Sequence, residues 1–294
     1  MKLSGTYTAL VTPFRGGAVD EEALRRLVEA QIAGGVAGLV PVGTTGESPT
    51  LTHEEHIRVI AKTVEFAAGR VQVLGGTGSN STDEAIELTR AAAEAGVDGA
   101  LLVAPYYNKP SQAGLYAHFS AIAESTRIPL VLYNIPGRCG VEIAVETVLA
   151  LSQAHKNVIG LKEAGGSVDR LSQLRQALPE DFALLSGDDS LTLPFLSVGA
   201  VGVISVASNL LPKAVVGLVR AFLSGDLQEA ERLHRRLYPL FRDLFVETNP
   251  VPIKTALSLH GWMASDVRLP LVPLQPSSRA RLEKTLSLVG MDDL

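Results

Sequence analysis

Short apolar runs alternate along the chain with longer segments in which apolar residues recur at i, i+3 and i+4, up to about residue 224. Short runs bounded by glycine, proline and asparagine are typical of buried strands, and the longer spacing is typical of amphipathic helices. The expected strands are Gly5–Pro13, Gly38–Gly43, Val71–Gly76, Gly99–Pro105, Pro129–Ile135, Val158–Ala164, Ala183–Gly187 and Gly202–Val206. The expected helices include Glu21–Ala33, His53–Ala67, Thr82–Ala95 and Gln112–Thr126.

The number of strand–helix units distinguishes between two parallel architectures. A (β/α)8 TIM barrel over residues 1–224 uses all eight strands, whereas a doubly wound open sheet needs neither an eighth strand nor closure. No G-x-G-x-x-G motif follows an expected strand, so the usual dinucleotide-binding form of the open sheet is not indicated. The pattern therefore predicts an α/β barrel.

The pattern changes near residue 225, because no further strand alternates with the helices. Three later segments have helical spacing, namely Leu227–Phe245, Val251–Leu259 and Ser277–Leu288. They are interrupted by Asn249-Pro250, Gly261 and the proline-rich stretch Leu269–Pro276. Residues 225–294 are therefore expected to form a three-helix appendage that covers the barrel or mediates assembly.

Composition narrows the class of protein further. The chain is 46% apolar and 19% charged, as in ordinary globular proteins. A net charge of -5 without a basic stripe argues against nucleic acid as a partner. The single cysteine, Cys139, excludes an intrachain disulfide, and the sequence has neither a signal-peptide pattern nor an apolar segment long enough to span a bilayer. We expect a cytoplasmic protein without a membrane partner.

Lys162 carries the strongest chemical implication, because it lies in the short apolar run Val158–Ala164. An unpaired ammonium in a buried strand is costly, so either a carboxylate pairs with it or its pKa falls towards that of a neutral amine. A neutral amine is a nucleophile that forms a Schiff base with a carbonyl compound. The alternative is a structural lysine paired with Glu163, but neighbouring side chains on a strand point to opposite faces. The other seven of the eight lysines lie in turns, termini or helical patterns.

The C-terminal ends of barrel strands carry the chemistry in such folds, so the polar residues there are candidates. The second strand runs into Gly43-Thr44-Thr45-Gly46-Glu47-Ser48, whose hydroxyls and glycine backbone favour an anion cradle suited to a carboxylate. The alternative is the capped start of a helix, because Thr52 is an adequate N-cap with Glu55 three residues on.

Two further strand ends add a phenol, a guanidinium and two carboxylates. Tyr133 lies two residues after Val131 on the same strand, so its side chain points into the barrel if the odd-numbered positions do. In that position its phenol can exchange protons with a nearby nitrogen. The alternative is a hydrogen-bonded core residue without a chemical role. Arg138, in a glycine–proline turn, binds a substrate carboxylate or is solvated. Asp188-Asp189 lack a histidine or glutamate at ligand spacing, so we expect no metal. The residues alone indicate a cofactor-free barrel enzyme that uses a lysine Schiff base on a carboxylate-bearing carbonyl compound.

Several motifs, taken in order, closely resemble the dihydrodipicolinate synthase family of pyruvate-dependent lyases, which includes N-acetylneuraminate lyase. They are GTTGE at 43–47, PYYNKPSQ at 105–112, YNIPGR at 133–138, GLKEA at 160–164, SGDD at 186–189 and FVETNPVPIK at 245–254. The resemblance runs from Gly5 to the last expected helix. It implies a lyase that condenses pyruvate with L-aspartate-4-semialdehyde, without a cofactor, at the first committed step of diaminopimelate and lysine synthesis.

The resemblance also implies site roles and a homotetramer. By resemblance, Lys162 is the nucleophile, and Thr44, Tyr133 and Tyr107 form a proton relay in which Tyr107 reaches a neighbouring subunit. The resemblance also implies that Thr45 and the backbone near Ile204 contact the pyruvate carboxylate. Gly187 would form a wall of the site, and Arg138 would contact the semialdehyde carboxylate. A guanidinium at position 138 favours the lysine-biosynthesis branch, because it is not the characteristic group for holding a sugar acid. An aldolase for another 2-oxo acid and a non-catalytic barrel are the rival interpretations.

A second site is implied for L-lysine as a feedback inhibitor at a subunit interface. Its residues by resemblance are Ser48, His53, His56, Asn80, Glu84 and Tyr106. His53 and His56 are spaced i, i+3 and are expected on one helix face; the alternative is a pair of surface histidines without a ligand. Pro49 and Ser81 depart from the small alanines often found at these positions.

Overall fold

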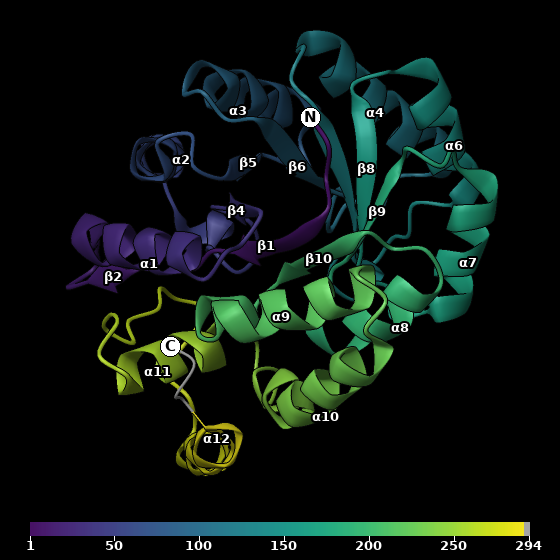
Figure 1. Ribbon diagram of the computed structural model, residues 1–294. Coiled ribbons are helices and arrows are strands. Elements are labelled where there is room, and N and C mark those ends of the chain that lie inside the picture. Colours follow the sequence, from purple (N-terminus) through teal and green to yellow (C-terminus); the bar gives the residue numbers. More distant parts are fainter. Residues whose placement is uncertain (291–294) are drawn as a thin grey trace.

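In the computed structural model, which describes residues 1–290, eight parallel strands close into a barrel in the order β1-β10-β9-β8-β7-β6-β5-β4 (Figure 1). These strands are β1 Gly5–Ala9, β4 Gly38–Val40, β5 Gln72–Gly76, β6 Gly99–Val103, β7 Leu130–Asn134, β8 Val158–Glu163, β9 Ala183–Ser186 and β10 Gly202–Ser205. The predicted barrel is confirmed. Most strands end earlier than predicted, because the last residues of each apolar run turn into the loops at the barrel mouth.

Helices surround the barrel and cover the outer face of the sheet (Figure 1). They are α1 Glu21–Ala33, α2 His53–Ala67, α3 Thr82–Glu94, α4 Gln112–Ser125, α6 Val145–Ala154, α7 Val168–Ala177, α8 Thr192–Ser197 and α9 Pro212–Leu223. The expected cap of α2 is present, since Thr52 and Glu55 form a reciprocal capping box. Glycines in the left-handed region follow the ends of α1, α2 and α3, at Gly35, Gly69 and Gly96.

Several short elements have no signal in the hydrophobic pattern. They are the hairpin β2 Phe14–Arg15 and β3 Ala18–Val19, the one-turn helix α5 Pro136–Cys139, and the 3-10 turns η1 Ser48–Thr50, η2 Asp189–Leu191 and η3 Ala207–Asn209. Each is too short to show a period of its own. The turns η2 and η3 follow β9 and β10 within three residues, and η1 lies later in the loop after β4, so all three belong to loops at the C-terminal ends of barrel strands.

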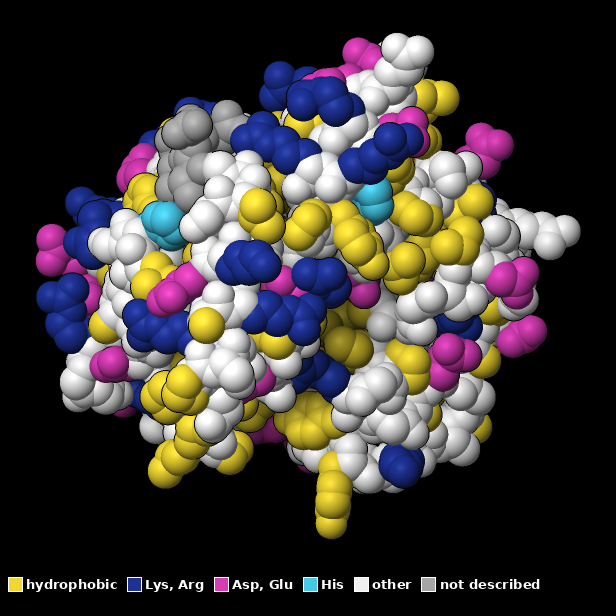
Figure 2. All heavy atoms as spheres, turned by 90° about the horizontal axis from the view of Figure 1, so that it is seen from below, with side chains coloured by type: hydrophobic (Ala, Val, Ile, Leu, Met, Phe, Trp, Pro, Cys, Tyr) yellow, Lys and Arg dark blue, Asp and Glu magenta, His cyan; other side chains and the backbone are white. Residues whose placement is uncertain are grey.

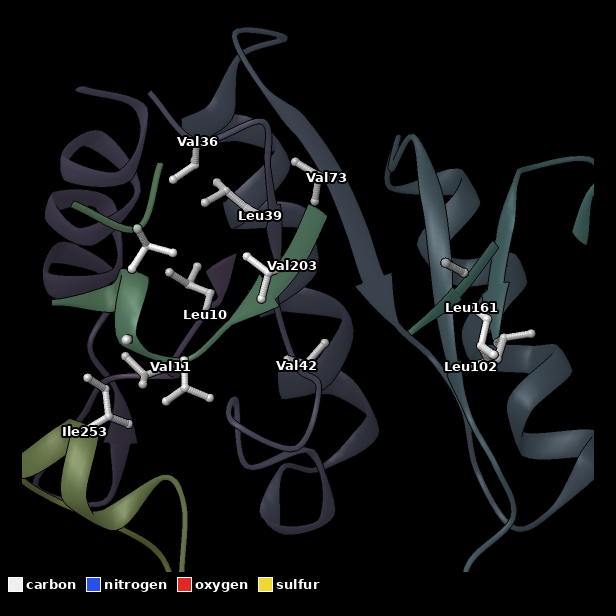
Figure 3. Packing of buried hydrophobic residues seen from close by; sticks show 14 of the residues in the cluster. Leu10, Val11, Val36, Leu39, Val42, Val73, Leu102, Leu161, Val203 and Ile253 are labelled. Carbon is white, nitrogen blue, oxygen red and sulfur yellow. The ribbon is translucent and has the colours of Figure 1, made fainter. Parts of the chain in front are cut away.

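Strand alternation divides the buried apolar residues into two clusters. Outward residues such as Leu39, Leu161 and Val203 pack in a large cluster with the helices (Figure 3). The inward residues fill the barrel itself; they include Tyr7, Leu74, Leu101, Val131, Leu185 and Ile204. The barrel interior is thus a packed core beneath the mouth.

The chain after the barrel forms the helices α10 Leu227–Asp243, α11 Val251–Leu259 and α12 Pro276–Val289. Helix α10 packs against α9, and α12 packs against α10 and α11. The split into domains at residue 224 stays a prediction. Across residues 1–290, no helix combines the length and the apolar character that a membrane crossing needs.

Asp243, at the end of α10, joins two of these helices. Its fully buried carboxylate accepts hydrogen bonds from Arg242, from Arg281 of α12 at 2.6 Å and from Thr285 of α12 at 2.6 Å. The arginine and threonine donors hold the pKa of this carboxyl well below its usual range, although burial opposes them.

We predict that Asp243→Ala lowers the free energy of unfolding by roughly 1–3 kcal/mol, because several buried hydrogen bonds to a charged group are lost. Glu283→Ala in α12 removes only the exposed pair with Arg279 and is the matched control. Its expected cost is about 0.5 kcal/mol or less. Denaturant unfolding of both variants checks this, and equal losses would contradict the role assigned to Asp243.

Candidate active site

Lys162 lies on β8 beside Tyr133 of β7, and both side chains project from paired positions towards the barrel interior. Its side chain is buried, and its Nζ lies 4.1 Å from the centroid of the Tyr133 ring. No carboxylate of the described residues lies within ion-pair distance of this nitrogen. Burial lowers the pKa of Lys162 to about 7, although Asp189 acts in the opposite direction. A substantial share of the amine is therefore neutral, and so nucleophilic, near neutral pH.

Glu163 does not pair with Lys162, which removes the alternative of a structural ion pair between them. Its buried carboxylate accepts hydrogen bonds from Asn134 at 3.0 Å, from Arg170 at 3.0 Å and from the backbone of Gly165 at 2.6 Å. This network ties the ends of β7 and β8 to α7. Glu163 thus fixes the strand end that carries the nucleophile while facing away from it.

Asp189 is a second buried acid, and its hydrogen-bond partners could not be predicted from the sequence. Its carboxylate accepts from Ser205 Oγ at 2.5 Å and from the backbone amides of Val206 and Ala207 at 2.9 Å each. Burial raises the pKa of Asp189 to about 6. Asp189 joins the ends of β9 and β10, and the part of the chain that the structure describes contains no cluster of ligands arranged for a metal.

Tyr133 and the threonine pair stand beside the lysine. Burial raises the pKa of Tyr133 to about 12, against a hydrogen bond with Thr44, so the phenol stays protonated. Thr45 is buried, and its hydroxyl accepts from Asn249 Nδ2 at 3.0 Å. Arg138, on the short helix α5, donates to the backbone oxygen of Asn249 at 3.2 Å. Asn249 therefore contacts two predicted site residues, and it was missed because it lies in the C-terminal region.

A cavity of about 240 Å³ opens above the barrel core. Thr44, Tyr133 and Arg138 line it together with Ser48 and Tyr106. It has mostly apolar walls and a few polar groups, as small-molecule sites commonly have.

Two more predicted site residues, Ile204 and Gly187, lie in β10 and directly after β9. Ile204 is buried in the barrel interior. At Gly187 a Cβ would lie 2.7 Å from Ala164 Cβ and 3.0 Å from Lys162 Cε, so only glycine fits beside the lysine.

Tyr107 is not brought to the other site residues within one chain. Its side chain is 90% exposed and its φ of 72° lies in the left-handed region that non-glycine residues rarely adopt. The adjacent Tyr106 lines the cavity instead.

The residues assigned to a lysine site gather between α2 and α3. His53 Nε2 lies 2.6 Å from Glu84 Oε1, and Ser79 also donates to Glu84, which together lower the pKa of that carboxyl. His56 is buried, donates to the Gly76 carbonyl at 2.7 Å, and has a pKa lowered by burial. The two histidines differ in environment, since the His53 side chain is 66% exposed.

Other members of the group make polar contacts around the same place. Ser48 Oγ lies 3.4 Å from His56 Nδ1. Asn80 Nδ2 donates to the backbone oxygen of Tyr106 at 3.2 Å. The six predicted residues are thus connected by neighbouring contacts, and two of them, Ser48 and Tyr106, line the cavity.

A second buried lysine, Lys254 of α11, was treated in the sequence as an ordinary helical residue. It is fully buried and its Nζ lies 2.5 Å from Glu47 Oε1. Burial lowers the pKa of Lys254, and the Glu47 carboxylate offsets that effect. An amine committed to a carboxylate has no lone pair for a carbonyl carbon, so Lys162 stays the candidate nucleophile.

A desolvated lysine at the C-terminal end of a barrel strand, with a phenol and hydroxyls beside it, is the arrangement of a barrel enzyme that forms a Schiff base. The model of the dihydrodipicolinate synthetase family matches residues 2–289, and the chain belongs to this family.

Named relatives agree with this assignment. A 4-hydroxy-tetrahydrodipicolinate synthase from Endomicrobium trichonymphae is 53% identical over 98% of this chain and 99% of its own length. The solved structure of a 4-hydroxy-tetrahydrodipicolinate synthase from Methylacidiphilum fumariolicum SolV is 61% identical, with a TM-score of 0.97 over 98% of this chain and 96% of that one. A family member from Cyanidioschyzon merolae, solved with lysine bound, is 43% identical with a TM-score of 0.96 over 98% of each chain.

We predict that borohydride trapping of pyruvate on Lys162 rises with pH through a midpoint of about 7, because the ammonium must lose its proton before it attacks the ketone. Peptide mass spectrometry after short incubations across pH 5 to about 9 measures the adduct. Lys254 provides the internal control, since it is buried but paired and is expected to stay unlabelled. An adduct yield that stays low up to about pH 8 and is still rising steeply at about pH 9 would indicate an ordinary exposed amine and contradict the prediction.

Proposed function

We propose that this chain condenses pyruvate with L-aspartate-4-semialdehyde to give 4-hydroxy-tetrahydrodipicolinate and water, for diaminopimelate and lysine synthesis. The observation that carries the proposal is the buried, unpaired amine of Lys162 against the Tyr133 ring. The family relationship supports the choice of substrates.

The first half-reaction uses the amine and its hydroxyl neighbours. Lys162 attacks the ketone carbon of pyruvate, and loss of water gives an iminium ion. Tyr133, protonated and in contact with Thr44, supplies a proton to the departing oxygen. Loss of a methyl proton from the iminium then gives an enamine, whose methylene carbon is the nucleophile for the second substrate. Thr45 and the backbone near Ile204 hold the pyruvate carboxylate in this scheme.

The second half-reaction forms a carbon–carbon bond and then releases the enzyme. The enamine carbon attacks the aldehyde carbon, and a proton is delivered to the new alkoxide. The amino group of the semialdehyde then attacks the iminium carbon, closing the ring and expelling Lys162 as a free amine. Arg138 binds the semialdehyde carboxylate, for which a guanidinium offers two parallel donors. Gly187 leaves room for the intermediates next to Lys162.

The test is an assay with both substrates together with an Arg138→Ala variant. We expect turnover of aspartate semialdehyde by the native chain, and an increase of about tenfold or more in its KM in the variant, because a charge-assisted bidentate contact is lost. Trapping of pyruvate on Lys162 should stay nearly unchanged. If the variant loses imine formation equally, the role of Arg138 is wrong. Turnover of a sugar acid in place of the semialdehyde would support another aldolase of the same chemistry.

Feedback inhibition by L-lysine is part of the proposal. Glu84 would bind one ammonium, while Asn80 and Tyr106 would bind the carboxylate. Ser48 and Tyr106 line the same cavity as Thr44 and Tyr133, which offers a direct physical connection between the inhibitor and substrate groups. The lysine-bound relative from Cyanidioschyzon merolae supports this assignment.

We expect Glu84→Gln to raise the lysine concentration for half-inhibition by about tenfold or more, because an amide replaces the anionic partner of an ammonium. Asp83→Asn, in the same first turn of α3 and exposed, is the matched control and should leave inhibition unchanged. Initial rates at increasing L-lysine measure both. An unchanged native rate at millimolar lysine would remove the inhibitor site from the proposal.

We also propose a homotetramer, in which Tyr107 completes the proton relay of a neighbouring subunit. The exposure of Tyr107, together with exposed apolar residues such as Leu269 and Leu288, supports burial against other chains. Figure 2 shows hydrophobic side chains gathered in patches on one face of the molecule. The cytoplasmic location expected from the sequence stays a prediction.

A further inference from the structure

The loop after β4 carries both Thr44 and Thr45, and its backbone is held in an unfavourable conformation. Glu47 has a φ of 56°, in the left-handed region that side chains other than glycine seldom occupy. Such a backbone persists only where surrounding contacts determine it. Glu47 is also close to the threonines, because its backbone amide donates to the Thr44 carbonyl at 3.1 Å.

The contacts of the Glu47 carboxylate come from the far end of the chain. The Glu47 carboxylate is buried; one oxygen lies 2.5 Å from Lys254 Nζ and the other accepts from the Arg268 backbone amide at 3.1 Å. Lys254 is fully buried, and its Nζ also lies 4.2 Å from the centroid of the Phe14 ring. Both members of the pair are thus enclosed, so the direction of the carboxylate is fixed.

The same C-terminal region holds the loop on either side of Glu47. Towards the barrel, Asn249 donates to Thr45 Oγ1 at 3.0 Å. Away from it, Arg268 donates to the Thr50 carbonyl at 2.8 Å and forms an ion pair with Glu55 at the start of α2. The chain between Thr45 and α2 is therefore attached to the C-terminal region at several points, with the buried ion pair in the middle.

Apolar packing sets the position of the helix that provides Lys254. Ile253, the neighbouring residue on α11, belongs to the same buried cluster as Val11 and Leu10 beyond β1 (Figure 3). Helix α11 is consequently a rigid part of the core, and its lysine acts on the loop from a fixed point.

We propose that the Glu47–Lys254 ion pair positions Thr45 for the carboxylate of pyruvate and Thr44, which contacts Tyr133, for proton transfer at its ketone oxygen, so that Lys254 is a positioning residue of the reaction. This inference rests on the proposed function, because it assumes that pyruvate is the ligand of the two threonines. Lys254 touches no reacting atom, and its effect reaches the substrate only through the loop backbone.

The test separates positioning from stability by comparing two variants. Lys254→Met leaves the Glu47 carboxylate buried without a counter-charge and is expected to be destabilised. The double variant Glu47→Gln with Lys254→Met removes both charges at similar volume, and such replacements of buried pairs are often neutral for stability. We expect the double variant to melt close to the native protein.

Pyruvate dependence is the decisive measurement on the double variant. Its pyruvate KM should rise about tenfold, because Thr45 no longer orients the bound ground state, and kcat should fall by about threefold or more, because Thr44 of the proton relay moves with the same loop. The pH midpoint for trapping on Lys162 should not move, since the barrel interior is unaltered. Asp243→Ala is the control, because a loss of stability in the appendage should leave the pyruvate KM unchanged.

The outcomes can be told apart. A stable double variant with the native pyruvate KM would overturn the positioning role, and so would a double variant that cannot fold, since the pair would then serve stability alone. A native chain without a pyruvate adduct on Lys162 would refute the proposed function itself.

Discussion

The burial of one amine, that of Lys162, is the constraint on which the proposed chemistry depends. Lys162 projects into a barrel filled by inward side chains, and the cost of keeping an ammonium there brings its pKa to about 7. The closed sheet surrounds Lys162 with inward side chains from other strands, and this packing keeps water from its side chain. Barrel closure, interior packing and amine reactivity are therefore one physical arrangement, and the neighbouring phenol of Tyr133 shares it.

The buried acids around the barrel mouth form no ion pair with Lys162, so they do not restore its pKa to the ordinary value. Glu163 is committed to Asn134 and Arg170, and Asp189 to Ser205 and two backbone amides. Each carboxylate joins adjacent elements at the mouth and has its own donors. The acids therefore stabilise the ends of β7 to β10, where the candidate site lies, without forming an ion pair with the lysine.

The C-terminal region is part of the site as well as a cover for it. Asn249 contacts Thr45 and Arg138, and Lys254 and Arg268 hold the loop that follows β4. The same loop continues into Ser48, which lines the cavity shared by the substrate group and the candidate lysine group. One segment thus connects the barrel mouth, the appendage and the edge of a second ligand region.

The sequence by itself determined the barrel, most helix bounds and the buried lysine that is the candidate nucleophile, because hydrophobic period, caps and a charge inside an apolar run are local properties of neighbouring residues. The Glu47–Lys254 pair and the Asn249–Thr45 contact were decided only in the tertiary structure, since their partners are 207 and 204 residues apart along the chain. No local period reports which distant side chain meets a buried carboxylate. Lys254 therefore looked like an ordinary helical lysine until the fold enclosed it with Glu47.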